Sequence, residues 1–189
     1  MTNAELEFPR GTKLPRQTPL FWVADKDRYI RQLALRDLQE RFGRRQIVYF
    51  TRCDSNAQID GDDDRFLVEL LIGIGREPID LHLETNGGYT DSAEKIISIL
   101  GPHRENLRVI VPRRAKSNGT LLALAAETIV MGIGSELGPI DPNIVLGPGQ
   151  TVPAQFIVQS AGVDPIIKQI AQYAITQTQQ LAANLLQTG

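Results

Sequence analysis

Apolar positions along the chain alternate between two spacings. Short apolar runs that suit strands are followed by stretches in which apolar residues recur at helical spacing. The predicted strands cover residues 46–51, 79–84, 107–111 and 128–131, and the predicted helices cover 27–42, 64–74, 91–100, 117–126 and a last region that begins near residue 164. This alternation predicts an α/β domain with a largely parallel sheet, whose ligands bind at the carboxyl ends of the strands.

Both ends of this pattern differ from its centre. Residues 1–24 hold Pro9, Pro15 and Pro19 among polar residues, a composition that favours an extended N-terminal arm. Residues 25–189 are expected to form one domain, although the pattern breaks over the Gly- and Pro-rich residues 132–153. The chain has 189 residues, which is enough to bury a core without disulfide or metal support.

Composition excludes several classes of protein. The 22 acidic and 20 basic residues give a net charge of −2, which argues against general nucleic-acid binding. Cys53 is the only cysteine, so a disulfide framework is excluded and a reducing compartment is favoured. No apolar run reaches the ~18 residues of a membrane span, and residues 1–13 lack the apolar centre of a secretory signal. A cytoplasmic protein is therefore expected.

An acidic segment precedes the second predicted helix. Its aspartates suggest calcium at first sight, but the ordered ligand spacing and the closing glutamate of a calcium loop are missing. A solvated loop that ends in a helix N-cap is the favoured interpretation, and no metal is expected. The segment contains Asp54, Asp60, Asp62, Asp63 and Asp64.

The first turn that could carry chemistry is Thr85-Asn86-Gly87-Gly88, between a strand and a helix. Its paired glycines allow unusual backbone conformations and expose N–H groups, so the turn could bind an oxyanion. A tight turn with no further role is the alternative. The glycine spacing is neither that of a Walker loop nor that of a dinucleotide fingerprint, and no cofactor is expected.

The second turn runs from Pro112 to Thr120 and leads into an apolar helix. Ser117 lies at the start of this helix, where free N–H groups and the positive end of the dipole favour an alkoxide or a neighbouring oxyanion. The serine could be a nucleophile or a simple helix cap, and it lacks the Gly-x-Ser-x-Gly elbow of the α/β-hydrolases.

Taken together, four segments resemble a known family. They are residues 80–88, 111–126, 129–132 and 137–142, of which Ser-x-Gly-Thr-Leu-x-Ala-Leu-Ala-Ala and Leu-Gly-Pro-x-Asp-Pro are the most specific. The chain is similar over roughly residues 46–180 to the serine dehydrogenase proteinase family, within the Clp-peptidase and crotonase-like fold that also includes signal peptide peptidase A. The resemblance implies a spiral of β-β-α units, a homo-oligomer, and a serine that hydrolyses peptides or unfolded proteins.

Carried over by position, the resemblance makes Ser117 the nucleophile. It gives the oxyanion hole to the backbone N–H groups of Gly87 or Gly88 and of Asn118. Family members commonly carry methionine and a small residue on either side of the serine, whereas this chain has Lys116 and Asn118. The Asn118 side chain is therefore expected to narrow the site.

The general base is the least determined part of this interpretation. Related Clp peptidases use a histidine downstream of the serine, but His82 and His103 both precede Ser117. Signal peptide peptidase A uses a lysine, and Lys168 is the only lysine after Ser117, although the family's lysine aligns closer to Tyr173. Lys168 is thus the candidate base of a Ser–Lys peptidase, with a solvated lysine as the alternative.

Two other functions remain open on the same scaffold. The oxyanion turns would also stabilise the enolate of an acyl-coenzyme A thioester, although no acid or base motif for that reaction is visible. The missing downstream histidine and the displaced lysine favour a non-catalytic assembly or binding subunit. Asp141 could orient a base or simply close a rigid loop between Pro139 and Pro142.

Overall fold

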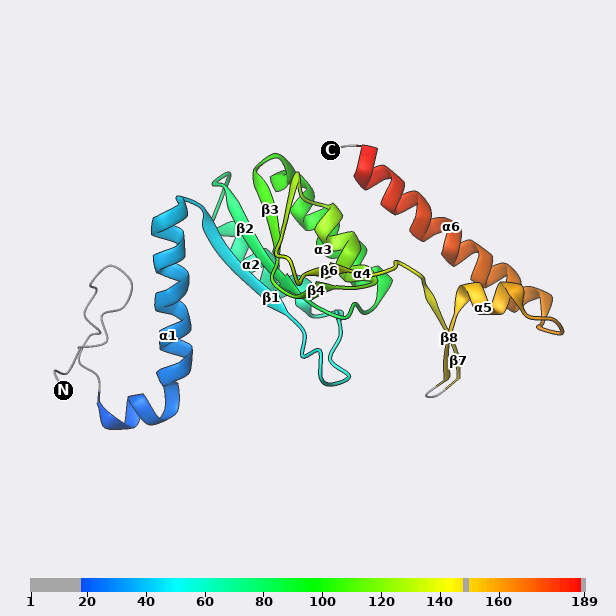
Figure 1. Cartoon of the computed structure of the whole chain (residues 1–189), viewed down its shortest axis with the longest axis horizontal. Coiled ribbons are helices and arrows are strands. Elements are labelled where there is room, and N and C mark those ends of the chain that lie inside the picture. Colours follow the sequence, from blue (N-terminus) through cyan, green and yellow to red (C-terminus); the bar gives the residue numbers. More distant parts are fainter. Residues whose placement is uncertain (1–17, 148–149, 188–189) are drawn as a thin grey trace. The chain divides into compact units, whose positions relative to one another are not determined.

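The computed structural model describes residues 18–147 and 150–187 (Figure 1). Residues 1–46 and 47–189 form two compact units, and each is described by itself. In the first unit, helix α1 (Pro19–Phe42) begins after Thr18, whose Oγ1 accepts a hydrogen bond from the Phe21 N–H, and ends at Gly43 with a φ of 62°.

Helix α1 begins earlier than residue 27, where the sequence pattern places its start. Pro19 occupies the first turn, where a helix needs no N–H from it. Residues 19–24, assigned to the extended arm, are therefore helical, and residues 1–17 of that arm lie outside the described residues.

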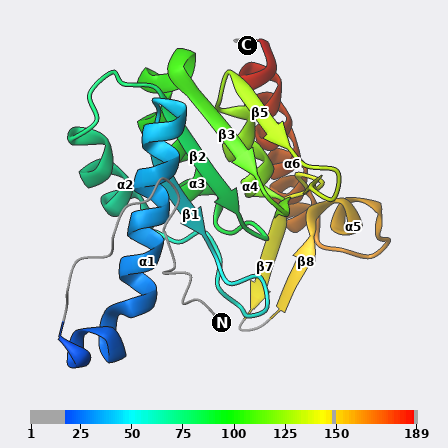
Figure 2. The ribbon, with the colours of Figure 1, turned by 60° about the vertical axis from the view of Figure 1, so that its left-hand side comes forward.

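A four-stranded sheet with the order β1-β2-β3-β5 forms the centre of the second unit, and its first strand starts at Arg45, two residues before that unit begins. Figure 2 shows the strands side by side, and β2 pairs with β3 and β3 with β5 in parallel. The strands are β1 (Arg45–Phe50), β2 (Ile79–Glu84), β3 (Leu107–Val111) and β5 (Thr128–Met131). The predicted α/β class and parallel sheet are confirmed, with strand bounds that agree to within one residue.

Three helices connect these strands. They are α2 (Asp63–Ile72), α3 (Thr90–Leu100), which continues into the 3-10 helix η1 (Gly101–Asn106), and α4 (Asn118–Leu124). Alternate residues of β2 and β3 are buried with the apolar faces of these helices, because successive side chains of a strand point to opposite faces. The most enclosed large apolar side chains of these elements are Ile79, Leu81, Leu83, Leu100, Leu107, Val109, Val111, Leu121 and Leu122.

A second, smaller sheet lies at the carboxyl ends of the main strands. Strands β4 (Arg114–Ala115) and β6 (Glu136–Leu137) pair in parallel, and Thr85 forms a further parallel bridge with Ala115. Each main strand from β3 onward is thus followed by a short strand of the second sheet. The segment β3-β4-α4 is a β-β-α unit of the kind that the resemblance implies, whereas β5-β6 continues into the β7-β8 hairpin.

The Gly- and Pro-rich stretch contains regular structure that the sequence pattern does not predict. Strands β7 (Asn143–Gly147) and β8 (Gln150–Pro153) form an antiparallel hairpin, followed by α5 (Ala154–Gln159) and α6 (Pro165–Gln187). These elements pack around a small cluster of their own, which contains Ala154, Ile157, Ala171 and Ile175. Among the described residues, no helix has the length and apolar composition of a membrane span.

Helix α6 also joins the main core through its C-terminal half. Ala182 and Leu185 belong to the larger apolar cluster. The Arg104 guanidinium donates hydrogen bonds to the Ala125 carbonyl at 3.2 Å and to the Leu185 carbonyl at 2.7 Å. Arg104 therefore caps the C-terminal ends of α4 and α6 together.

Candidate active site

The two turns singled out in the sequence lie against each other. The Thr85 N–H donates to the Arg114 carbonyl, and the Lys116 N–H donates to the Thr85 carbonyl, both at 3.1 Å. Gly87 has a φ of 104°, and a Cβ built on it would lie 2.7 Å from the Ser117 Cβ. Position 87 thus requires glycine for two reasons, namely its positive φ and its close approach to Ser117.

Gly88 is fixed from the other side by a segment of the acidic loop. Ile59 forms a parallel bridge with Gly88, the Ile59 N–H donates to the Gly87 carbonyl at 2.9 Å, and the Tyr89 N–H donates to the Ile59 carbonyl at 3.0 Å. A Cβ on Gly88 would collide with the Ile59 backbone. The conformation of the first turn is therefore set by contacts on both of its faces.

Ser117 has a strained backbone. Its φ of 51° and ψ of −125° make it the only residue other than glycine with a positive φ in the described part of the chain. Its N–H donates to the Pro139 carbonyl at 3.1 Å, and its carbonyl accepts from the Thr120 N–H at 2.8 Å. The side chain makes no capping hydrogen bond, so the cap interpretation does not account for this serine. Such strain is characteristic of functional turns.

Two backbone amides beside Ser117 have no acceptor among the described residues. The Gly87 N–H donates to Thr85 Oγ1 at 3.0 Å, but neither the Gly88 N–H nor the Asn118 N–H donates a hydrogen bond within the described chain. Asn118 is the first residue of α4, where a helix always leaves N–H groups unpaired. Gly88, Asn118 and Ser117 all line the same cavity.

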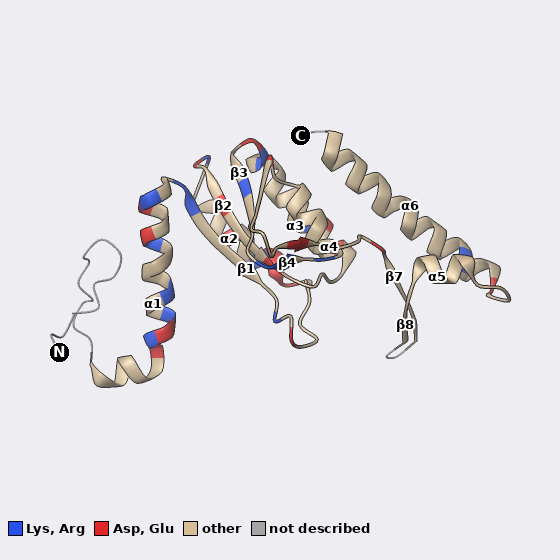
Figure 3. Ribbon diagram, viewed as in Figure 1, with Lys and Arg blue, Asp and Glu red and all other residues tan. Residues whose placement is uncertain are grey.

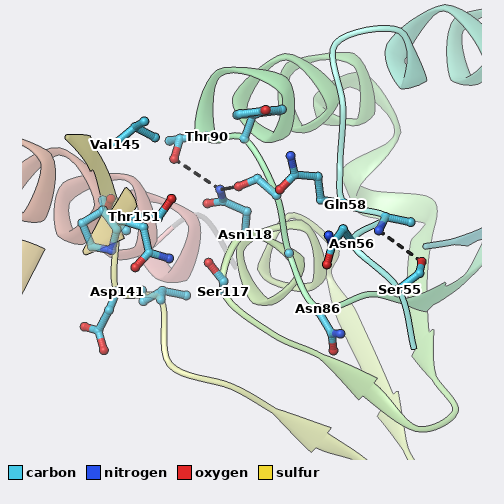
Figure 4. A pocket seen from close by; sticks show the side chains of 18 residues that line it. Ser55, Asn56, Gln58, Asn86, Thr90, Ser117, Asn118, Asp141, Val145 and Thr151 are labelled. Atoms are coloured by element: carbon cyan, nitrogen blue, oxygen red, sulfur yellow. Dashed lines mark hydrogen bonds between the residues drawn. The ribbon is translucent and has the colours of Figure 1, made fainter. Parts of the chain in front are cut away.

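The cavity has a volume of about 410 Å³ and is lined mainly by amide and hydroxyl groups (Figure 4). Asp141 is its only charged lining residue among those described, is solvent-exposed, and points away from Ser117 in Figure 4. No lysine, arginine or histidine of the described chain lines this cavity.

Lys168, the expected base, lies elsewhere on α6. It is the only charged residue of that helix, which is otherwise uncharged in Figure 3. Helix α6 contributes Thr178 to the cavity wall. At a rise of 1.5 Å per residue, Lys168 lies about 15 Å along the helix axis from Thr178. Tyr173 is exposed and also lies outside the cavity lining.

The remaining basic residues near the second turn are engaged away from Ser117. The Lys116 Nζ lies 3.0 Å from a Glu136 carboxylate oxygen, and the Lys116 side chain packs on Gly138. A guanidinium nitrogen of Arg113 lies 3.9 Å from a Glu84 carboxylate oxygen. The Arg114 Nε lies 3.9 Å from a Glu136 carboxylate oxygen. The three basic side chains of the second turn thus share two neighbouring glutamates.

Neither histidine lines the cavity. His82 is partly buried on β2, and burial is the main cause that lowers its pKa from the usual value, with Asp80 and Arg108 as the nearby charges. His103 lies in η1, next to a different hollow. The histidines of the described chain therefore offer no base at this cavity.

Several residues of the cavity wall were not predicted. Thr178 is 5% exposed and lies on the inward face of α6, so a polar residue on an apolar stripe was the available signal. The loop at 55–58 and hairpin residues Asn143, Val145 and Thr151 also contribute. The hairpin gave no signal, since its strands lie in the irregular Gly- and Pro-rich stretch.

Two curated proteins of an archaeon have sequences similar to this chain. The chain is 39% identical over 131 residues to the uncharacterized protein MJ0137 of Methanocaldococcus jannaschii, covering 66% of this chain and 45% of the relative. It is 34% identical over 112 residues to the uncharacterized protein MJ1495 of the same organism, and the match covers 58% of this chain and 38% of that relative. The chain therefore spans less than half the length of these curated relatives.

Two similar solved structures are forms of the 1510-N membrane-bound stomatin-specific protease. A lysine-to-alanine mutant in complex with a substrate peptide has a TM-score of 0.48 at 22% identity, over 71% of this chain and 58% of the other. A serine-to-alanine mutant has a TM-score of 0.42 at 20% identity, and the match covers 70% of this chain and 68% of the other. The model of the ClpP-like SDH-type serine proteinases matches residues 28–189. The chain therefore belongs to the ClpP-like SDH-type serine proteinase family.

Proposed function

We propose that this chain is a serine peptidase in which Ser117 is the nucleophile and the Gly88 and Asn118 amides form the oxyanion hole. The observation that carries the proposal is the strained Ser117 beside two amides that have no acceptor in the described chain. Donors fixed in place before the reaction stabilise a developing oxyanion most effectively. Gly87, whose amide is engaged by Thr85, contributes by lacking a Cβ.

In the proposed reaction, the Ser117 hydroxyl oxygen attacks a peptide carbonyl, and its proton passes through a base to the departing amine. The carbonyl oxygen carries the negative charge of the tetrahedral intermediate and accepts hydrogen bonds from both amides. Water then attacks the acyl-enzyme and releases the acid. The polar cavity suits an extended peptide, whose own amides require hydrogen-bond partners.

The base is proposed to be Lys168 from a second copy of the chain in a homo-oligomer. Lys168 does not line the cavity of its own chain, and an unassisted serine hydroxyl is a weak nucleophile. Mixing Ser117→Ala with Lys168→Ala protein tests this directly, because only mixed oligomers combine an intact serine with an intact lysine. Recovered activity supports the proposal, and a fully active Lys168→Ala protein contradicts it.

The proposed nucleophile is tested with a fluorophosphonate probe. The wild-type protein is expected to be labelled at Ser117, and Ser117→Ala is expected to remain unlabelled. Ser160→Ala is a matched control, since Ser160 lies outside the cavity lining. Labelling that persists in Ser117→Ala would exclude Ser117 as the nucleophile.

A second candidate function is a non-catalytic binding or assembly subunit. The absence of a basic side chain from the cavity lining of the described residues favours it. The protein is incubated for a long time with peptides and with casein, and its oligomeric state and the labelling of Ser117 are measured. Intact substrates, stable oligomers and an unlabelled Ser117 would together favour the non-catalytic function.

A further inference from the structure

The side chain of Asn118 connects the two turns of the site. Asn118 is 6% exposed and lies at the start of α4, directly after Ser117. Its Nδ2 donates a hydrogen bond to the Gly88 carbonyl at 2.6 Å and another to Thr90 Oγ1 at 3.2 Å, as Figure 4 shows. A carbonyl only accepts hydrogen bonds, so the amide nitrogen must face Gly88.

We infer that the Asn118 side chain is a positioning residue that holds the Gly88 backbone in place for oxyanion binding. This inference rests on the proposed peptidase function. The same residue would supply one oxyanion donor through its backbone and fix the other through its side chain. The two donors would then keep their separation, because one short side chain joins their turns.

Gly88 needs such a restraint more than other residues would. Glycine has the largest conformational freedom of any residue, and Gly88 cannot be replaced by a stiffer one because a Cβ would collide with Ile59. Ile59 holds the turn on one face through hydrogen bonds to Gly87 and Tyr89, the residues on either side of Gly88. The Gly88 carbonyl itself accepts its hydrogen bond from Asn118.

The rate of the proposed reaction depends on how firmly its two oxyanion donors are held. Loss of one oxyanion donor costs about 100- to 1000-fold in rate, and a donor displaced by about 1 Å costs up to about 100-fold. Removal of the Asn118 side chain leaves both backbone amides present and frees one of them. The expected loss is therefore between about 10-fold and 100-fold in the bond-forming step.

Labelling kinetics with the fluorophosphonate probe test this inference. Asn118→Ala and Asn118→Asp are expected to lower the maximal labelling rate of Ser117 by about 10-fold to 100-fold without a change in the concentration for half-maximal rate. The aspartate variant keeps the size of the side chain, but its ionised carboxylate repels the Gly88 carbonyl. Gln177→Ala is the matched control, because it removes another side-chain amide that links two elements, through Glu94.

A second measurement separates this inference from the proposed function. In Asn118→Ala, the NMR order parameter of the Gly88 N–H is expected to fall while those of the β2 amides stay unchanged. If the wild-type protein is not labelled at Ser117, the peptidase proposal fails, and this measurement alone decides the positioning role. A folded Asn118→Ala with wild-type labelling, or with an unchanged Gly88 order parameter, overturns the inference.

Discussion

The two turns of the site achieve unusual backbone conformations in different ways. In the first turn, the positive φ falls on Gly87, which adopts it without steric cost. In the second turn, the positive φ falls on Ser117, which has a Cβ and is strained there. A glycine would be more stable at position 117 but would carry no hydroxyl. The first turn thus has the residue that suits its backbone conformation, whereas the second keeps a serine where glycine would fit with less strain.

The largest effect is expected where the first turn is most enclosed. Gly88→Ala would place a methyl group in the Ile59 backbone and is expected to lower the free energy of unfolding by about 3 kcal/mol. Urea denaturation measures this loss. A Gly88→Ala protein of wild-type stability would show that the first turn is not held against Ile59.

Gly87→Ala tests the contact between the turns. The methyl group would meet the Ser117 Cβ at 2.7 Å in a backbone conformation that disfavours alanine, so a loss of about 2 kcal/mol is expected. Gly43→Ala is the control, because Gly43 has a φ of 62° but nothing within 4 Å of the position that a methyl carbon would take. It is expected to lose only about 1 kcal/mol, the conformational part. Equal losses would indicate that Gly87 and Ser117 do not touch.

The strain at Ser117 predicts a gain in stability. Ser117→Gly is expected to raise the free energy of unfolding by about 1 kcal/mol and to abolish probe labelling. Ser117→Ala also removes the hydroxyl but keeps the Cβ, so its stability should stay near that of the wild type. Thermal unfolding of the two variants separates backbone strain from loss of the hydroxyl, and identical unfolding temperatures would refute the strain.

The smallest effect concerns the strand that leads into the first turn. Burial lowers the pKa of His82 in the folded protein, so the unfolded chain binds the proton more readily. Stability should therefore be unaffected above the unfolded pKa of about 6.5 and should fall as the pH drops below it. Denaturation midpoints between about pH 7.5 and 5.5 measure this decline, which His82→Gln should reduce. If the denaturation midpoint of His82→Gln fell with pH as much as that of the wild type, titratable groups other than His82 would cause the decline.

The sequence predicts the fold better than it predicts the site. The strands at 79–84, 107–111 and 128–131 agree with the structure because each is an apolar run between clear breaks. The contact between Gly87 and Ser117 required the family resemblance, since no local pattern links residues that far apart in sequence. The place of Thr178 in the cavity wall and the hydrogen bonds of Asn118 depend on packing between α3, α4 and α6, which periodicity does not encode.

Arg104 has a consequence for how the cavity deforms. One guanidinium ties the last carbonyls of α4, whose first residue follows Ser117, to the end of α6, whose middle supplies Thr178. Arg104 thereby connects the helix that follows Ser117 to the helix that carries Thr178, and Arg104 itself lies outside the cavity lining. If the cavity changes shape, the change is therefore expected in the loop at residues 55–58 and in the β7-β8 hairpin, which Arg104 does not hold.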